Sequence, residues 1–139
     1  MDWSSEKKFF ENRIKREKLR LFEKRPHIVY YFHSLTDPYS HLTCQILENF
    51  VNKYDVELKI LFVSDPHNVF TPERKMFIDY YLNDALNLAK YHGLKFEYTG
   101  QPKEKNILIA HKILNFYFFQ KEITQIDFIK LLIKISSSL

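Results

Sequence analysis

Apolar and polar positions divide the chain into a charged leading segment, a strand–helix–strand segment and a helical remainder. Residues 4–24 predict a helix, because apolar side chains recur at helical spacing on a charged background. The apolar stripe consists of Phe10, Ile14 and Leu21, with Phe9 and Phe22 beside it. Pro26 ends the helix. Because the stripe is apolar, we expect this face to pack against another surface.

The second segment has the pattern of a βαβ unit. Residues 28–32 form an apolar run without polar alternation, which predicts a strand covered on both faces. Asp37 and Pro38 have the preferences of an N-cap and a first helical residue, and the helix that they begin fills the gap before the next strand. Residues 56–63 predict that strand. This order indicates two parallel strands joined by a crossover helix.

Three helices and one short alternating segment follow. The helices are predicted over residues 71–93, 104–119 and 124–135. Thr71 with Pro72 repeats the cap-and-proline pattern, and Gly93 is a natural C-terminal stop. Thr124, with an aspartate three residues later, gives the last helix a start that is similar to a capping box. Residues 94–98 alternate like a short strand.

These elements predict a protein of the α/β class with three parts. The parts are a basic amphipathic helix at residues 1–26, a βαβ unit at residues 27–64 and a helical region at residues 65–139. Two parallel strands do not make a stable sheet alone, because three or more are normally needed. Three resolutions stay open: the chain forms a homodimer, residues 94–98 add a third strand, or the sequence is one part of a longer protein.

Composition narrows the class of protein. The length of 139 residues fits one domain, and 45% hydrophobic residues exclude a disordered chain. A single cysteine excludes a disulfide framework, a cysteine-rich zinc site and a two-cysteine redox pair within the chain. No run reaches the roughly 18 apolar residues of a membrane span, and the N-terminus lacks the apolar core of a signal peptide. We therefore expect a cytoplasmic protein without a membrane span.

The net charge of +4 lies entirely in the leading segment. Residues 1–25 hold nine basic and five acidic side chains, and the remaining residues are neutral overall. A basic arm can bind nucleic acid by releasing counterions. Here the interspersed acids weaken such a patch, so the pattern favours a solvated helix face and disfavours nucleic acid as a partner.

The loop between the first strand and its helix is the candidate site. In an open α/β sheet, ligands bind beyond the carboxyl ends of the strands, next to helix N-termini. Asp37 can serve there as a functional carboxylate, as an N-cap, or as both. His33 and His41 flank the loop and are either acid–base groups or structural residues, and their spacing disfavours a metal site. Cys44 is predicted to be a small buried hydrophobic residue.

The same residues carry a resemblance to a known family. Tyr31-Phe32-His33 leading into Asp37-Pro38-Tyr39-Ser40-His41-Leu42 resembles the first strand and active-site turn of DsbA-like thioredoxin-fold proteins. The branch that it resembles contains the kappa-class glutathione transferases and the 2-hydroxychromene-2-carboxylate isomerases. Gly93-Leu94-Lys95-Phe96, after its helix, is similar to the helical insertion of that branch. The resemblance covers roughly residues 28–115 and implies a thioredoxin-like fold whose second half is not evident in this chain.

The resemblance also implies a set of site residues. The family's Cys-Pro-His-Cys motif is replaced here by Asp37-Pro38-Tyr39-Ser40, so dithiol exchange is chemically impossible at this turn. In the glutathione-using branch, a serine at the position of Asp37 binds the thiolate, which an ionised aspartate would repel. The implied catalytic residues are Asp37, Ser40 and Ser34, and the implied cofactor-binding residues are Thr36, Pro38 and Tyr39. The implied cofactor is glutathione, without a metal.

Two functions of different classes remain open from the sequence. One is a thiol-cofactor transferase or isomerase that uses a small-molecule thiol. The other is a non-catalytic, degenerate thioredoxin-like module that binds a protein partner or pairs with itself. The retained turn favours the first function, whereas Asp37 and the missing second half favour the second.

Overall fold

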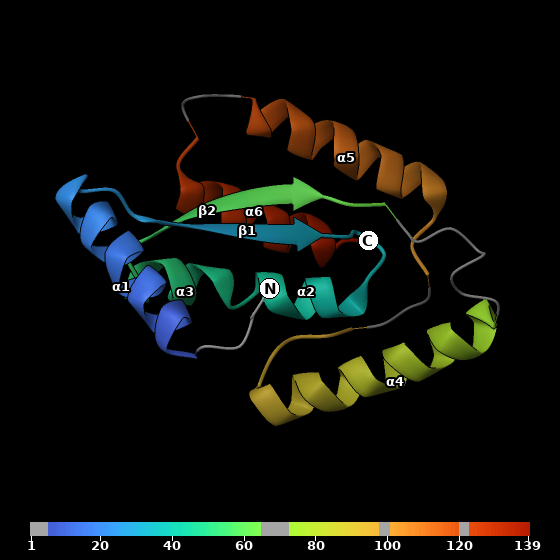
Figure 1. Ribbon diagram of the computed structural model, residues 1–139. Coiled ribbons are helices and arrows are strands. Elements are labelled where there is room, and N and C mark those ends of the chain that lie inside the picture. The colour runs from blue at the N-terminus through green and yellow to red at the C-terminus, as the bar shows by residue number, and fades with distance from the viewer. Residues whose placement is uncertain (1–5, 65–72, 98–100, 120–122) are drawn as a thin grey trace.

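The computed structural model describes residues 6–64, 73–97, 101–119 and 123–139. In chain order, the elements are α1 (Glu6–Phe22), β1 (His27–His33), α2 (Pro38–Cys44), α3 (Leu47–Lys53), β2 (Val56–Phe62), α4 (Arg74–His92), α5 (Glu104–Phe118) and α6 (Gln125–Ser136) (Figure 1). The predicted α/β class is confirmed.

The βαβ unit forms as predicted, with one difference in its helix. β1 and β2 pair in parallel, from His27 opposite Val56 to His33 opposite Phe62. The crossover is two short helices, so the prediction of one continuous helix was wrong. At the break, the amide of Gln45 donates to Leu42 (3.3 Å), which lies only three residues back. This tighter turn redirects the chain before α3 begins.

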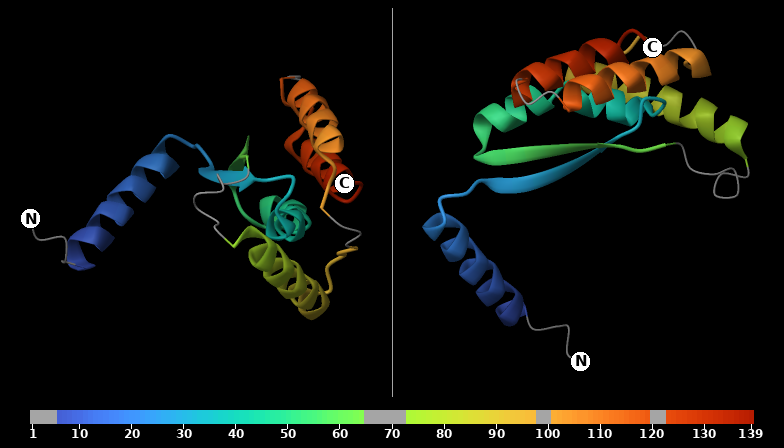
Figure 2. Two further views of the ribbon diagram at one scale, coloured as in Figure 1. Left: turned by 90° about the vertical axis from the view of Figure 1, so that its right-hand side faces the viewer. Right: turned by 90° about the horizontal axis from the view of Figure 1, so that it is seen from above.

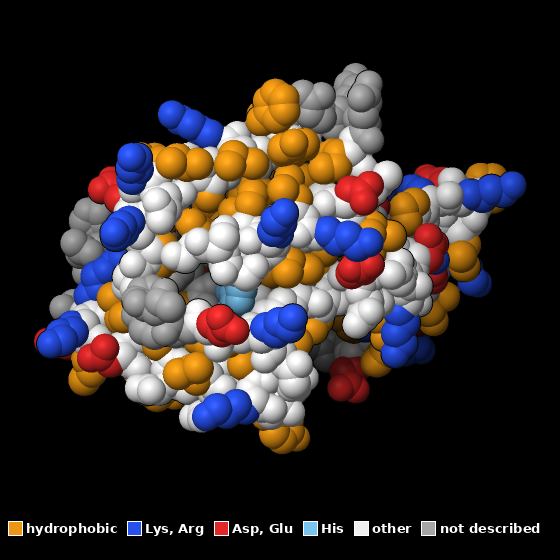
Figure 3. Space-filling model, turned by 180° about the vertical axis from the view of Figure 1, so that it is seen from behind, with side chains coloured by type: hydrophobic (Ala, Val, Ile, Leu, Met, Phe, Trp, Pro, Cys, Tyr) orange, Lys and Arg blue, Asp and Glu red, His pale blue; other side chains and the backbone are white. Residues whose placement is uncertain are grey.

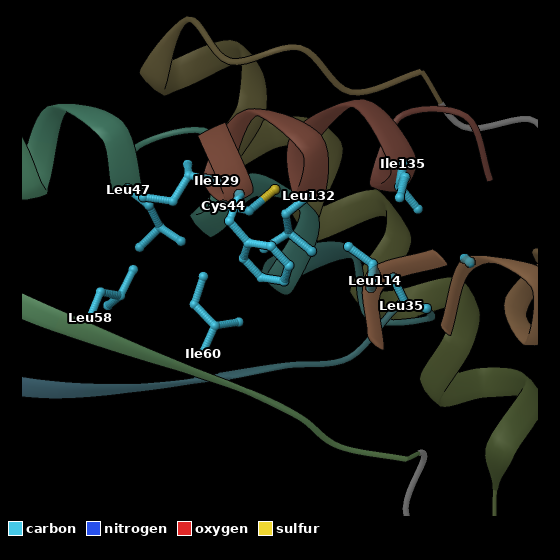
Figure 4. Packing of buried hydrophobic residues seen from close by; sticks show 11 residues of the cluster. Leu35, Cys44, Leu47, Leu58, Ile60, Leu114, Ile129, Leu132 and Ile135 are labelled. Carbon is cyan, nitrogen blue, oxygen red and sulfur yellow. The ribbon is translucent and has the colours of Figure 1, made fainter. Parts of the chain in front are cut away.

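The core lies between one face of the sheet and the helices behind it. β2 contributes Leu58 and Ile60, which point toward α3 and α6 (Figure 4). Within this core cluster, the side chains with no exposed surface come from three helices and are Cys44 of α2, Leu114 of α5, and Ile129 and Leu132 of α6. The final helix is therefore a central part of the core.

The opposite face of the sheet is open, which corrects the prediction that the first strand is covered on both faces. Along β1, Ile28, Tyr30 and Phe32 are 48%, 61% and 58% exposed. Helices α2, α3, α5 and α6 lie on one side of the sheet, and no described helix crosses in front of it (Figures 1 and 2). We call the surface formed by Ile28, Tyr30, Phe32, Lys59 and Leu61 the open face.

The segment after α4 does not add a strand to the sheet. Residues 94–97 have no regular structure, and residue 98 lies outside the described ranges. The side-chain amide of Gln45 donates to the carbonyl of Lys95 (2.7 Å) and accepts from its amide (3.0 Å). This pair of bonds ties the segment to the α2–α3 junction. Within the described residues the sheet has two strands, so the third-strand alternative was wrong for residues 94–97.

Two helix ends follow the sequence signals closely. Gly93 closes α4 in the left-handed conformation, with φ of 66°, which suits glycine because it has no Cβ. The Thr124 side chain caps α6 by accepting from the amide of Asp127 (3.1 Å). The predicted Thr71–Pro72 start of α4 lies outside the described residues, as do residues 4 and 5 of the predicted leading helix.

Helix α1 projects from the body of the protein (Figure 2), and its apolar stripe is uncovered. None of its residues is buried, so nothing within the described chain covers its apolar face, and its docking stays a prediction. Arg20 holds the end of the helix by pairing with Glu17 (2.7 Å) and Asp55 (3.2 Å). Among the helices in the described ranges, none is long and apolar enough to cross a membrane.

Candidate functional site

The turn after β1 is organised around the Asp37 carboxylate. Asp37 has extended backbone angles and caps α2, as the sequence predicts. Its Oδ2 accepts from the amide of Ser40 (2.8 Å) and from the hydroxyl of Ser40 (2.6 Å). Ser40 is itself buried, and its Oγ accepts from the amide of Ser34 (3.2 Å). The structure thus brings together the three residues that the family resemblance implied to be catalytic.

The remaining hydroxyls of the turn are also engaged. The Oγ of Ser34 lies 3.0 Å from the Oγ1 of Thr36 and accepts from the amide of Thr36 (3.4 Å). These bonds close the loop on itself. The hydroxyls of Ser34, Thr36 and Ser40 therefore all help to hold the turn.

Pro38 and Tyr39 face different surroundings. Pro38 is buried at the first position of α2. Tyr39 points to α4, where its hydroxyl donates to the Oδ2 of Asp84 (2.6 Å). Partial burial, and then the Asp84 carboxylate, raise the pKa of Tyr39 to about 12. Tyr39 therefore links α2 to α4 instead of pointing at the Asp37 carboxylate.

A buried hydrogen-bonded chain lies behind the turn, and sequence reasoning missed it. The Nδ1 of His33 lies 2.8 Å from the hydroxyl of Tyr31, and its Nε2 lies 3.2 Å from the hydroxyl of Ser136 in α6. The Tyr31 hydroxyl donates to the carbonyl of Ser40 (2.9 Å). The chain runs from the end of α6 through β1 to the start of α2.

The hydrogen-bonded chain places a proton on the Nδ1 of His33, and burial keeps the ring neutral. Because the single Tyr31 proton goes to Ser40, the Nδ1 of His33 must be the donor to Tyr31. In the neutral imidazole that burial favours, the Nε2 then accepts from the hydroxyl of Ser136. Burial, with the nearby His41 and His111, lowers the pKa of His33 to about 4. His33 is a structural histidine in the core.

His41 and Cys44 lie on the buried side of α2. Burial lowers the pKa of His41, and its Nδ1 has no hydrogen-bond partner among the described residues. Cys44 has no exposed surface, and burial raises the pKa of its thiol to about 12. A thiol held protonated in the core is a weak nucleophile. The prediction that Cys44 is a buried hydrophobic residue is confirmed.

Two hollows flank the Asp37 turn. The first, which we call the Arg74 hollow, has a volume of about 310 Å³ and lies at the carboxyl ends of the strands. It is lined by Ser34, Thr36, Asp37, Arg74, Phe77 and Tyr81, among others. The second, of about 320 Å³, lies between His41 and the last residues of the chain. Asp37 and Thr36 form the wall between them.

Comparison with known proteins identifies no relative. No family model, curated protein or solved structure matches this chain. The site must therefore be interpreted from its own geometry. Within the described ranges, no three His, Cys, Asp or Glu residues come together in a way that could hold a metal ion.

The capping role of Asp37 predicts a loss of stability on substitution. Asp37→Ala removes the acceptor of the Ser40 amide and hydroxyl, and we expect it to lower the free energy of unfolding by about 1–2 kcal/mol. Asp37→Asn keeps a capping oxygen and should cost less than Asp37→Ala. Urea unfolding of both variants measures the difference. Equal losses in the two variants would show that the carboxylate charge, and not the cap, matters at this position.

Proposed function

We propose that this chain is a non-catalytic α/β binding module that docks a protein partner on its open face. The observation that supports the proposal is the uncovered apolar side of the sheet. Tyr30 and Phe32 are more than half exposed, and Leu61 of the neighbouring strand is 39% exposed. Parallel sheets are normally covered on both faces. An exposed apolar face of this kind is typical of a protein–protein interaction surface.

The total exposed area supports the same proposal. The chain exposes 11166 Å². A compact monomer of 16.9 kDa exposes roughly 7,700 Å². The difference of about 3,500 Å² exceeds the roughly 800 Å² that each partner buries in a standard interface. Further apolar side chains are exposed on α5, at the top of the rear surface (Figure 3).

The chemistry of the turn supports a non-catalytic role. Its carboxylate and hydroxyls hydrogen-bond one another, and the histidine behind them is buried and neutral. The turn has no thiol, and the thiol of Cys44 is protonated and fully buried. A degenerate thioredoxin-like domain, which keeps the turn without the redox pair, fits this arrangement.

Photo-crosslinking from the open face tests the proposal. We expect benzoylphenylalanine at position 30 to form covalent protein adducts in cells that express the full chain, because Tyr30 lies in the middle of the open face. The matched control is benzoylphenylalanine at position 91 of α4, where Tyr91 is 84% exposed. Gel shifts with mass spectrometry measure the adducts. Equal labelling from positions 30 and 91 would contradict docking on the open face.

The Arg74 hollow favours a second candidate function, the binding of a thiol cofactor such as glutathione. The hollow combines an arginine, which binds carboxylates, with the hydroxyl-bearing turn. In this role Thr36 and Ser34 would contact the ligand, and Asp37 would stay a cap. A transferase or isomerase activity of the glutathione type would need this binding step first.

Calorimetry with glutathione tests the second candidate. We expect a dissociation constant of about 1 mM for the wild-type chain and about tenfold weaker binding for Arg74→Gln. Arg13→Gln in α1 is the matched control, because Arg13 does not line the hollow. Absence of heat at millimolar glutathione, with a folded protein, would exclude this candidate.

A further inference from the structure

We propose that the partner is a second copy of this chain, which pairs antiparallel through the outer edge of β1 around a two-fold axis at Tyr30. This inference rests on the proposed function, because it names a partner for the edge of β1, which borders the open face. Four observations carry it: the unpaired groups of β1, the absence of charge along that strand, the blocked edge of β2 and the excess exposed area.

The outer edge of β1 presents unpaired main-chain groups. The His27 amide donates inward to Asp55 (3.1 Å), and the His33 carbonyl accepts inward from Val63 (2.9 Å). In a parallel pair, alternate residues bond to the neighbour. The amides and carbonyls of Ile28, Tyr30 and Phe32 therefore point outward, and no hydrogen bond from another described residue engages them.

β1 lacks the features that protect exposed edges. Natural edge strands carry lysine, proline, bulges or inward charges that prevent pairing with another chain. The strand from His27 to His33 has no lysine, arginine, carboxylate or proline. Its pairing with β2 is regular along all seven residues. An uncharged and regular edge of this kind is suited to adding a strand.

The edge of β2 is less accessible than that of β1. The outward amide of Leu58 donates to the Oε1 of Gln125, the first residue of α6 (2.8 Å). A partner strand therefore adds to β1 and not to β2.

The register follows from symmetry. With the axis at Tyr30, Ile28 faces Phe32 of the second copy, and Tyr30 faces itself. Each of these three hydrogen-bonded pairs exchanges two main-chain bonds, which gives six bonds in total. The product is a sheet of four strands, above the three that an independent sheet needs. Opposite residues share a face, so the two open faces join into one.

Charge and area favour a second copy as the occupant. A two-fold interface places each group opposite its own kind, and like charges directly opposite are destabilising. The β1 edge meets no such penalty, because it is uncharged. The exposed area in excess of a compact monomer, to which the projecting helix α1 also contributes, is larger than the roughly 800 Å² that each partner buries in a standard interface.

Mass and site-directed crosslinking test the inference on the full chain. We expect sedimentation equilibrium to give twice 16.9 kDa. Tyr30→Cys should form a disulfide-linked dimer on mild oxidation, because hydrogen-bonded antiparallel partners have Cα atoms about 5.5 Å apart. Lys59→Cys is the matched control, on the open face but one strand away from the edge. The native Cys44 is fully buried and does not interfere.

Charged variants test the register. We expect I28K/F32K and I28E/F32E each to be monomeric, since like charges meet across the axis. Mixing the two should restore a dimer, with Lys opposite Glu at both positions. Failure of the mixture to associate, or equal crosslinking of Tyr30→Cys and Lys59→Cys, would overturn the inference.

The two proposals fail in different ways. If the purified chain is monomeric and position 30 crosslinks to a different protein, the second copy is overturned and the binding module stands. If position 30 gives no adduct beyond the position 91 control, the proposed function fails as well.

Discussion

Lowering the pH from 6.5 to about 4 is expected to reduce the free energy of unfolding by about 3 kcal/mol through His33 alone. His33 is buried and neutral, and its pKa falls from 6.5 to about 4 on folding. Between these two values, the unfolded chain binds a proton that the folded chain does not. Stability is therefore complete above pH 6.5 and is lost progressively toward pH 4.

The structure supplies the physical reason for this loss. Protonation of His33 would turn its Nε2 into a donor facing the hydroxyl of Ser136, and would place a charge in the core. His41 is half-buried, and its burial lowers its pKa, so it adds to the effect in the same direction. Acid should therefore weaken the contact between the end of α6 and the strand.

His33→Gln is the variant that isolates the effect. Glutamine keeps a polar side chain and does not titrate, so we expect the dependence of stability on pH to be flatter in the variant. Urea unfolding at intervals from pH 7 to pH 4 measures both proteins, and the difference between their curves removes the contribution of the carboxylates. Parallel curves would contradict a neutral, buried His33.

Leu132→Ala is expected to lower the free energy of unfolding by about 3 kcal/mol. Leu132 has no exposed surface and packs with Ile129 and Cys44 in the middle of the core (Figure 4). Its removal leaves a cavity at the contact between α6 and the βαβ unit. Because this contact holds the final helix in place, the unfolding transition of the variant should also become less cooperative if α6 separates from the βαβ unit.

Leu108→Ala is the matched control for the core prediction. It makes the same chemical change on α5, where Leu108 is 56% exposed, and we expect a change within about 0.5 kcal/mol. Thermal and urea unfolding measure both variants. A loss in Leu108→Ala as large as that in Leu132→Ala would show that the rear surface of α5 is covered in solution.

Local signals allowed much of the fold to be predicted from the sequence. Asp37 before Pro38 marks the start of α2, and Thr124 and Gly93 mark helix ends that the structure confirms. These residues act on their own neighbours, so their effect does not depend on the rest of the chain. The parallel strands were predicted from the order of elements, since residues 28–63 have the strand–helix–strand order of a βαβ unit.

The errors concern what each element packs against. The apolar run of β1 predicts burial on both faces, but the described chain covers only one. Residues 94–97 alternate like a strand, yet Gln45 satisfies the main chain of Lys95 and holds the segment on the helices. Hydrophobicity shows that a surface needs covering, but not which segment covers it.

The residues of the turn were predicted from the sequence, but the buried hydrogen-bonded chain behind them was not. The sequence places Ser34, Asp37 and Ser40 on one loop, and the structure joins them by hydrogen bonds. The link from His33 to Ser136 spans 103 residues and has no local signature. A polar residue that interrupts the apolar end of a strand, as His33 does, is the one signal that could have suggested a buried network.

The hydrogen bond from Leu58 to Gln125 has a consequence for growth by strand addition. A sheet that could be extended at both edges would add one molecule after another and grow into a fibre. Here the Gln125 side chain occupies the outer edge of β2, so each molecule can add a strand only at β1. Pairing through β1 occupies the remaining free edge of both molecules, so the assembly stops at a dimer. We therefore expect removal of this side chain by Gln125→Ala to replace a defined stoichiometry with open-ended polymers.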